Sequence, residues 1–162
     1  MDPLEKLILR GDTTFILGYE AIKRGYKVFF YTPNDLVYKN NSVYAYAKVL
    51  NLNIKNGKEI FSYGEKEVLE LSSCDVILMR QDPPFNISYI TATHLLEKIA
   101  SKALILNDPF QVRNAPEKIF VTEFSKFMPK TLITRKFEEI ARFKEENKNI
   151  IIKPLYGNGG EG

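Results

Sequence analysis

The sequence predicts an α/β fold with parallel strands. A helical pattern ends at Gly25 and is followed at once by a β-rich run at residues 26–31. Further along, two short apolar runs at residues 75–80 and 103–106 flank a helical pattern at residues 86–102. Helices that alternate with short apolar strands are typical of α/β folds with a parallel sheet.

The composition is that of a globular protein of one domain or slightly more. The 162 residues are 44% apolar and 27% charged, and the net charge of +3 is spread over scattered lysines, so we expect no nucleic-acid partner. No apolar run approaches the roughly 20 residues of a membrane helix, and residues 1–6 lack a signal-peptide pattern. The single cysteine, Cys74, allows no internal disulfide, which suits a reducing compartment. We therefore expect a cytoplasmic protein without a membrane partner.

The first helix is expected between Asp12 and Gly25. Asp12 can cap its N-terminus, and Gly25 can adopt the left-handed conformation found just past many helix ends. Thr13 and Thr14 open the helix, where an anion could bind, although simple capping is the alternative. The apolar positions recur at helical spacing and would form one buried face. They are Phe15, Tyr19 and Ile22.

A β-hairpin is predicted next, from residues 36–38 and 42–52. It would turn at Asn40-Asn41, because asparagine tolerates positive φ. The second strand alternates small or apolar side chains with larger polar ones, as a half-buried strand does. The first set is Val43, Ala45, Ala47 and Val49, and the second is Tyr44, Tyr46 and Lys48.

The segment from 75 to 106 is expected to contain two buried strands around a helix. The strands are predicted at residues 75–80 and 103–106, and the helix at residues 86–102 can be capped by Asn86 or Ser88. The apolar stripe of this helix would comprise Ile87, Ile90, Leu95 and Ile99.

The pattern changes near residues 108–113, where we expect a domain boundary. The elements predicted beyond it are a helix at residues 116–124 with proline at its start, a strand at residues 130–134, a charged amphipathic helix at residues 137–147, and a strand at residues 149–153.

A proline-stiffened loop after residues 75–80 carries two charged side chains. Arg80 suits bidentate binding of a carboxylate or phosphate, and Asp82 suits an ammonium or an amide. Pro83 and Pro84 restrict the backbone, and ligands of open α/β sheets bind beyond the carboxyl ends of the strands. The alternative is a structural turn that contains an Arg80–Asp82 pair.

The glycine-rich run that begins at Gly157 is a second candidate site. The glycines at positions 157, 159 and 160 lack Cβ atoms, so their backbone N–H groups can turn toward a phosphate. Lys153, which ends the preceding apolar segment, could reach the same phosphates as a point charge. The lysine precedes the glycines, so the pattern is not that of a P-loop. A lysine at a strand end before a glycine-rich lid is similar to the arrangement in ATP-grasp ligases.

Three single residues have plainer explanations. Cys74 and His94 are the only residues of their types, which leaves little for a transition-metal site. We expect Cys74 to be a packed small residue and His94 to be a surface or half-buried structural residue. Lys118 lies in the first turn of a predicted helix, where a cation is unfavourable. This is a hint of a ligand, with a solvated lysine as the alternative.

The chain as a whole resembles the prokaryotic glutathione synthetase family of the ATP-grasp superfamily. The matching segments run in family order and include an Arg-x-Asp-Pro-Pro-Phe run and a Lys-Pro-Leu-x-Gly-x-Gly-Gly run. They are Met1-Asp2-Pro3, Asp12-Thr13-Thr14-Phe15, Arg24-Gly25-Tyr26, residues 76–85, Glu117-Lys118-Ile119-Phe120, and residues 151–160.

The resemblance implies both a fold and an activity. It implies a Rossmann-like pre-ATP-grasp, substrate-binding domain with a parallel sheet at residues 1–112, and the beginning of an ATP-grasp domain at residues 113–162. The family joins γ-glutamylcysteine to glycine with ATP and Mg²⁺ through an acyl phosphate, and its members tend to be homo-oligomers. Lys118 and Lys153 would then hold the nucleotide, and Gly157, Gly159 and Gly160 would cover its phosphates.

In the same comparison Arg80 and Asp82 would face the peptide substrate, and Tyr156 receives no role. No residue of this chain is implied as a catalytic residue or as a metal ligand, because the Mg²⁺ ligands of the family lie beyond the lid. The family also places a buried strand before the Met-Asp-Pro motif. We therefore expect a front portion of the enzyme that lacks this strand, stops in the lid and is inactive alone.

Two other readings of the chain stay open. One is a non-catalytic peptide-binding or interaction module derived from an ATP-grasp ligase. The other is a different ATP-dependent carboxylate–amine ligase, against which the Arg80–Phe85 run argues.

Overall fold

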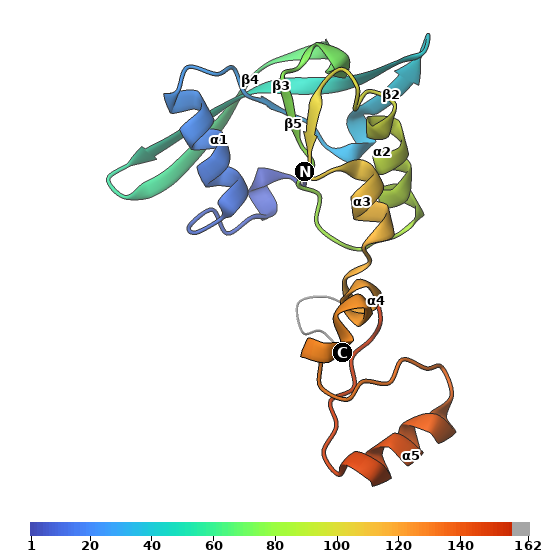
Figure 1. The fold of residues 1–162 in the computed structure, drawn as a ribbon. Coiled ribbons are helices and arrows are strands. Elements are labelled where there is room, and N and C mark those ends of the chain that lie inside the picture. The colour runs from blue at the N-terminus through green and yellow to red at the C-terminus, as the bar shows by residue number, and fades with distance from the viewer. Residues whose placement is uncertain (157–162) are drawn as a thin grey trace. The chain divides into compact units, whose positions relative to one another are not determined.

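The computed structural model describes residues 1–156 of the chain, which divides into two compact units (Figure 1). The first unit comprises Met1–Arg113 and the second Asn114–Gly162. Within the described residues, no helix is long and apolar enough to cross a membrane.

An antiparallel sheet forms the centre of the first unit. Its strands are β1 (Phe29–Phe30), β2 (Leu36–Lys39), β3 (Ser42–Lys55) and β4 (Lys58–Glu70). The long strand β3 pairs with β1 and β2 along one edge and with β4 along the other. In Figure 1, β3 and β4 form a long twisted ribbon that runs past α1 (Thr13–Lys23).

Two tight turns explain why this sheet is antiparallel. The turn between β2 and β3 is made by Asn40 and Asn41 with φ of 50° and 59°, which confirms the predicted hairpin. The turn between β3 and β4 is made by Asn56 and Gly57 with φ of 52° and 71°. Two-residue turns with two positive φ angles suit the twist of antiparallel strands, whereas parallel strands need a long crossover. Strand β4 was not predicted from the sequence.

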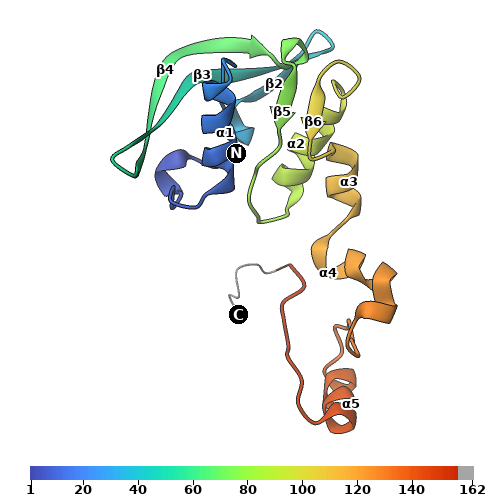
Figure 2. The ribbon, with the colours of Figure 1, turned by 60° about the vertical axis from the view of Figure 1, so that its left-hand side comes forward.

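The parallel part of the fold consists of one strand pair. Strands β5 (Val76–Leu78) and β6 (Leu104–Leu106) pair in parallel, and α2 (Ile87–Glu97) lies between them in the chain. The α/β class is thus confirmed, and among residues 1–156 its parallel strands are confined to this pair (Figure 2). Only the central residues Ile77 and Ile105 are buried, so these strands are half-buried and not fully buried as predicted.

Strand β3 contributes to two separate cores. Its buried residues are Val43, Ala45 and Ala47 before a register shift between Lys48 and Leu50, and Leu50 and Leu52 after it. Side chains alternate along a strand, so the change from odd to even positions means that the two sets face opposite sides of the sheet. The first core includes Val43 and Ala45 with residues of β5, β6 and α2. The second includes Leu50 and Leu52 with Phe15 of α1.

Helix α1 has the ends that the sequence predicts. The Asp12 carboxylate accepts a hydrogen bond of 2.7 Å from the Phe15 N–H, and Gly25 follows the helix with φ of 86°. Phe15 is fully buried, and Tyr19 and Ile22 pack beside it. A Cβ atom built on Gly18 would lie 2.7 Å from Leu52 Cδ1, so α1 packs closely on β3 at this point.

The helix predicted at residues 86–102 is shorter than expected and buries a different face. Asn86 caps α2 by accepting a hydrogen bond of 3.1 Å from the Tyr89 N–H. Ile87 is 76% exposed, so the predicted stripe is wrong at its first position, although Ile99 is buried beyond the helix end. The buried residues of α2 are Tyr89, Ala92, Thr93 and Leu96. Of these, Tyr89 and Leu96 belong to the same core as residues of β5 and β6.

An arginine joins α2 to α3 (Pro109–Asn114). The Arg113 guanidinium is only 13% exposed and lies 2.5 Å from the Glu97 carboxylate. It also donates a hydrogen bond of 3.2 Å to the Thr93 hydroxyl, which is fully buried. These contacts fix α3, at the C-terminal end of the first unit, to α2.

The second unit is less regular than the sequence predicts. The helix expected at residues 116–124 is divided into α4 (Glu117–Phe120) and the 3₁₀ helix η4 (Val121–Phe127), with non-helical dihedrals at Phe124. The remaining helix, α5 (Phe137–Asn147), has the predicted bounds. The strands predicted at residues 130–134 and 149–153 are wrong, because neither segment pairs with another among the described residues.

Short 3₁₀ helices complete the fold of the first unit. They are η1 (Leu4–Lys6), η2 (Pro33–Asp35) and η3 (Leu71–Ser73). Leu4 and Leu71 are almost completely buried, which anchors η1 and η3 to the two cores.

The contact between Gly18 and Leu52 predicts a difference between two valine substitutions in α1. Overpacking a core typically costs about 1–3 kcal/mol, so Gly18→Val should lower the free energy of unfolding by about that amount. Leu17→Val creates the same residue at the adjacent position, which is 49% exposed, and should cost only a few tenths of that. Urea unfolding of both variants measures the difference. Equal losses of stability would show that the α1–β3 packing tolerates a side chain at position 18.

Candidate functional site

The Arg80 side chain connects the end of β5 with the start of α1. Its Nε donates a hydrogen bond of 3.1 Å to the Thr14 hydroxyl, and its Nη2 donates one of 2.7 Å to the Thr13 hydroxyl. These partners are 66 and 67 positions apart from Arg80 in sequence. Arg80 and the two threonines are separate candidates in the sequence, and the structure places them in one cluster.

The backbone at Asp82 is held by a second N-terminal residue. The Asp82 N–H donates a hydrogen bond of 2.8 Å to the Asp2 carboxylate. The Asp82 side chain itself is exposed to solvent, as is Arg80. In Figure 2 the green connection between β5 and α2 accordingly runs beside the blue N-terminal segments. The contribution of Asp2 was missed in the sequence, because it depends on a contact between residues 80 positions apart.

Helix α2 fixes the other side of this loop. The Tyr89 hydroxyl donates a hydrogen bond of 3.3 Å to the Gln81 carbonyl, and the Phe85 and Tyr89 rings lie 5.1 Å apart. The Pro83–Pro84 peptide bond is cis. Burial and the nearby carboxylates of Asp82 and Asp2 raise the pKa of Tyr89. The phenol therefore stays protonated and keeps donating to the loop at neutral pH.

The charges of Arg80 and Asp82 do not neutralise each other. Among the ion pairs formed by residues 1–156, none contains Arg80 or Asp82. The described residues therefore do not form the Arg80–Asp82 pair that a purely structural turn would contain. A guanidinium and a carboxylate are thus presented two positions apart in sequence, each open to solvent.

The two candidate lysines of the second unit, Lys118 and Lys153, lie in segments that contact each other. The Lys118 ammonium on α4 donates a hydrogen bond of 3.4 Å to the Leu155 carbonyl, two positions beyond Lys153. Lys153 is exposed in an irregular segment. Gly157, Gly159 and Gly160 lie outside the described residues. The structure thus brings the Lys118 helix to the segment that leads into the glycine-rich run.

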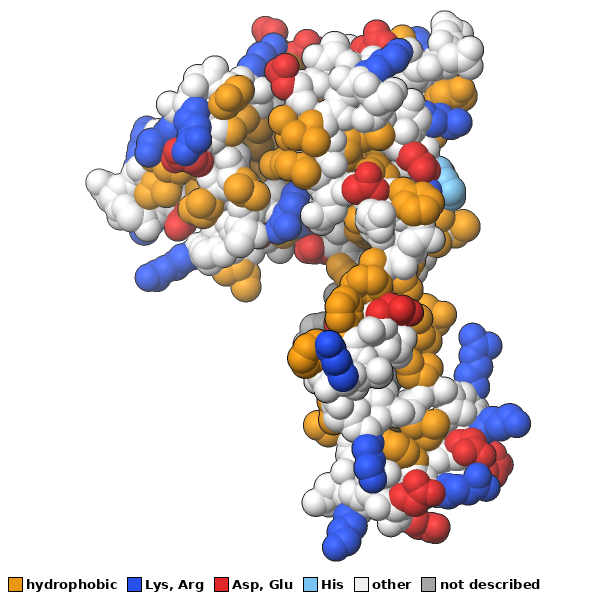
Figure 3. Space-filling model, viewed as in Figure 1, with side chains coloured by type: hydrophobic (Ala, Val, Ile, Leu, Met, Phe, Trp, Pro, Cys, Tyr) orange, Lys and Arg blue, Asp and Glu red, His pale blue; other side chains and the backbone are white. Residues whose placement is uncertain are grey.

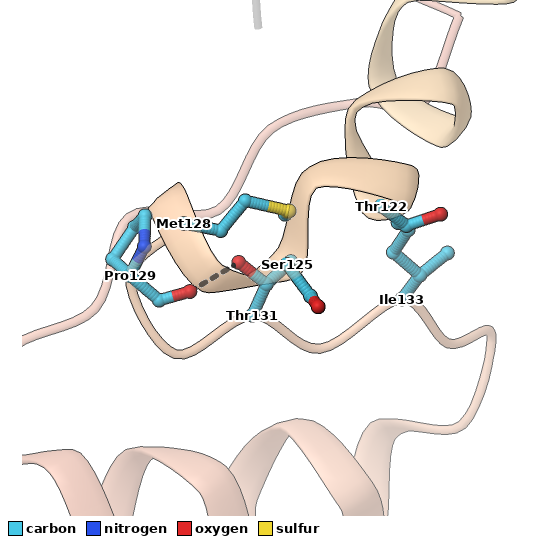
Figure 4. A pocket seen from close by; sticks show the side chains of 6 residues that line it. All are labelled: Thr122, Ser125, Met128, Pro129, Thr131 and Ile133. Carbon is cyan, nitrogen blue, oxygen red and sulfur yellow. Dashed lines mark hydrogen bonds between the residues drawn. The ribbon is translucent and has the colours of Figure 1, made fainter.

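A shallow hollow in the second unit is lined by residues other than the predicted site residues. It has a volume of about 350 Å³ and is lined by Thr122, Ser125, Met128, Pro129, Thr131 and Ile133 (Figure 4). The Thr131 hydroxyl is already used, since it donates to the Pro129 carbonyl at 2.9 Å. No residue predicted as a site residue lines this hollow, and its lining carries no charge.

Cys74 and His94 have the structural surroundings that the sequence predicts. Cys74 packs against the first core, and burial, with a smaller contribution from Asp75, raises the pKa of its thiol. His94 is 59% exposed and lies 3.8 Å from the Glu97 carboxylate. Within residues 1–156, no group of three or more His, Cys, Asp or Glu side chains could hold a metal ion.

The Asp2–Asp82 contact predicts a local loss of protection when Asp2 is truncated. Hydrogen bonds to charged groups contribute about 1.5–3 kcal/mol, so Asp2→Ala should speed exchange of the Asp82 amide on the order of tenfold. Asp2→Asn keeps an acceptor and should retain most of the protection. NMR hydrogen exchange measures this, with the Phe15 amide, bound to Asp12, as the unaffected control. Unchanged exchange at Asp82 in Asp2→Ala would mean that the loop is held without Asp2.

Family models account for both units of the chain. Residues 1–113 match the model described as the N-terminal domain of prokaryotic glutathione synthetase. Residues 117–162 match the model described as its ATP-grasp domain.

Individual relatives give the same result. The chain is 52% identical to the glutathione synthetase of Agrobacterium fabrum over 162 residues, which are 100% of this chain and 50% of the relative. It is 49% identical to that of Mesorhizobium japonicum, with 100% of this chain and 51% of the relative covered. Identity to that of Escherichia coli O157:H7 is 39%, with 99% and 51% covered.

The chain spans about half the length of the curated relatives that it matches. The N-terminal family model alone covers well over half of the chain, from residue 1 to residue 113. The chain therefore belongs to the prokaryotic glutathione synthetase family.

Proposed function

We propose that the protein carrying this chain ligates γ-glutamylcysteine to glycine with ATP. The ATP γ-phosphoryl group is transferred to the cysteinyl carboxylate, and the glycine amine then attacks the acyl phosphate and releases phosphate. The observation that carries this proposal is the Arg80 cluster, in which a guanidinium at the end of β5 is held by two hydroxyls and has no carboxylate partner among the described residues. Family membership supports the reaction class.

In this proposal Arg80 and Asp82 bind the peptide substrate. Arg80 orients a carboxylate, because a guanidinium can donate two parallel hydrogen bonds to its oxygens. Asp82 accepts from an ammonium or an amide. The Asp2 contact and the Tyr89 hydroxyl hold the backbone between them, which limits the entropy lost when the peptide binds.

The nucleotide is assigned to the second unit. Lys118 and Lys153 neutralise phosphate charge, and Gly157, Gly159 and Gly160 supply backbone N–H groups above the phosphates. The Lys118–Leu155 hydrogen bond supports this assignment, because it keeps α4 next to the segment of Lys153. Mg²⁺ would assist the phosphoryl transfer, but the described residues do not form a site that fits it, and none is assigned as its ligand.

The organisation proposed for the chain follows from these assignments. Residues 1–112 form the substrate-binding domain and residues 113–162 the beginning of the ATP-grasp domain. We further propose that the protein acts in the cytoplasm as a homo-oligomer, which agrees with the family resemblance.

The peptide site is tested by Arg80→Ala and Asp82→Ala in the full-length protein that carries this chain. Loss of one charge-assisted contact costs about 1.5–3 kcal/mol, which corresponds to an increase of the γ-glutamylcysteine KM of roughly 10- to 100-fold. The KM for ATP should change little. Arg24→Ala is the matched control, because Arg24 is an exposed arginine paired with Glu20. If the two KM values rise equally, the loop has a structural role and the peptide site lies elsewhere.

Lys153→Ala tests the nucleotide site in the same protein. The exposed position of Lys153 predicts little loss of stability, whereas the KM for ATP should rise roughly 10-fold or more and kcat should fall. Lys144→Ala, on the exposed part of α5, is the control for loss of a positive charge. Steady-state kinetics with varied ATP distinguishes the two variants. Kinetics identical to those of the control would mean that Lys153 is a solvated surface lysine.

A further inference from the structure

The two hydroxyls occupy one particular edge of the Arg80 guanidinium. Nε and Nη2, which donate to Thr14 and Thr13, form the side edge of the planar group. The end edge consists of the two terminal nitrogens, and no described residue accepts a hydrogen bond from Nη1. A guanidinium has five N–H donors in a fixed fork. With its side edge fixed, the group keeps two parallel donors on its end edge, which is the geometry that a carboxylate accepts.

Hydroxyl partners orient the guanidinium without neutralising it. An aspartate or glutamate at either position would fix the side chain equally well, but it would also pair with the charge and compete with an anionic ligand. Three other arginines of this chain donate to carboxylates, in contrast to Arg80, which donates to hydroxyls. Arg24 donates to Glu20, Arg113 to Glu97 and Arg142 to Glu139.

A purely structural role explains this arrangement poorly. Arg80 is exposed, and a hydrogen bond in an exposed position contributes little to stability, even with a charged donor, because water competes for both groups. Thr13 and Thr14 are also the first residues of α1, where the helix dipole disfavours a cation. A carboxylate at position 13 would suit both the helix dipole and Arg80. The hydroxyls therefore serve something other than the stability of this contact.

We propose that Thr13 and Thr14 are positioning residues that hold the end edge of Arg80 ready for a carboxylate of the peptide substrate. This inference rests on the proposed function, in which Arg80 binds γ-glutamylcysteine. It adds that the partners of Arg80 must be uncharged acceptors. It also makes the N-terminus of helix α1 a part of the substrate site.

The decisive test compares Thr13→Asn with Thr13→Asp in the full-length protein. Both side chains have a similar size and offer an acceptor to Nη2, but only the aspartate neutralises Arg80. Thr13→Asp should raise the γ-glutamylcysteine KM about tenfold relative to Thr13→Asn, with the ATP KM of the two variants equal. Thermal unfolding should show Thr13→Asp to be at least as stable as Thr13→Asn, because an acidic residue suits the first helical turn.

Loss of the hydroxyls gives a second measurement. The double variant Thr13→Val/Thr14→Val should raise the dipeptide KM several-fold, and Thr13→Ser/Thr14→Ser should restore it. Exchange of the Arg80 Nε–H with water, observed by ¹⁵N NMR, should be faster in the valine variant. The Arg24 Nε–H, which donates to Glu20, is the internal control. Thr91→Val is the control variant, because the Thr91 hydroxyl donates to the Ile87 carbonyl of its own helix.

The outcomes separate this inference from the proposed function. If Arg80→Ala raises the dipeptide KM while Thr13→Asp and Thr13→Asn give equal values, the function stands and the positioning role is wrong. If Arg80→Ala leaves the dipeptide KM unchanged, the peptide-site assignment fails and the positioning role fails with it. A parallel rise of the dipeptide and ATP KM values in Thr13→Asp would also overturn the positioning role.

Discussion

Strand β3 is the element on which the first unit depends, because it is shared by both cores. Before the register shift between Lys48 and Leu50 it buries side chains against β5 and α2, and after the shift it buries them against α1. The start of α1 and the end of β5 are thereby held in fixed positions relative to one strand. The end of β5 belongs to the first core and α1 to the second. Their shared attachment to β3 therefore brings Arg80 next to Thr13 and Thr14.

The energies of these contacts have different sizes and different consequences. Fully burying a large apolar side chain stabilises a fold by about 1.5–3 kcal/mol, and β3 shares several such residues with its neighbours. A hydrogen bond in an exposed position contributes about 0.5–1.5 kcal/mol or less. The backbone positions at the Arg80 cluster are therefore determined by the cores. The two hydroxyl contacts decide only which way one long side chain points.

Local signals in the sequence predicted local structure well and contacts across the chain poorly. Asp12 and Asn86 as helix caps, the Asn40-Asn41 turn and the bounds of α5 all depend on neighbouring residues, and all are confirmed. Strand β4 was missed because its two lysines and four glutamates hide the alternation, although Asn56-Gly57 is a strong turn signal. Residues 130–134 and 149–153 have the composition of strands, but a strand also requires a paired neighbour. Arg80 and Asp82 could be identified as candidates, whereas Thr13, Thr14 and Asp2 as their partners could not.

The two units differ in what holds their candidate site residues. No described residue from 114 to 156 is buried, and hydrophobic side chains such as Phe127 and Ile151, 77% and 85% exposed, lie open on this unit (Figure 3). Lys118 and Lys153 are therefore placed by a short helix and a backbone contact, without a packed core beneath them. Arg80, in contrast, lies two residues beyond the end of β5 and follows Met79, which is buried in the first core. A side chain supported in this way loses little freedom when it binds a ligand. The Arg80 loop, which we propose binds the peptide substrate, is thus the candidate site that this chain preorganises. Uncharged partners for Arg80 are consistent with a guanidinium that is oriented before a ligand arrives.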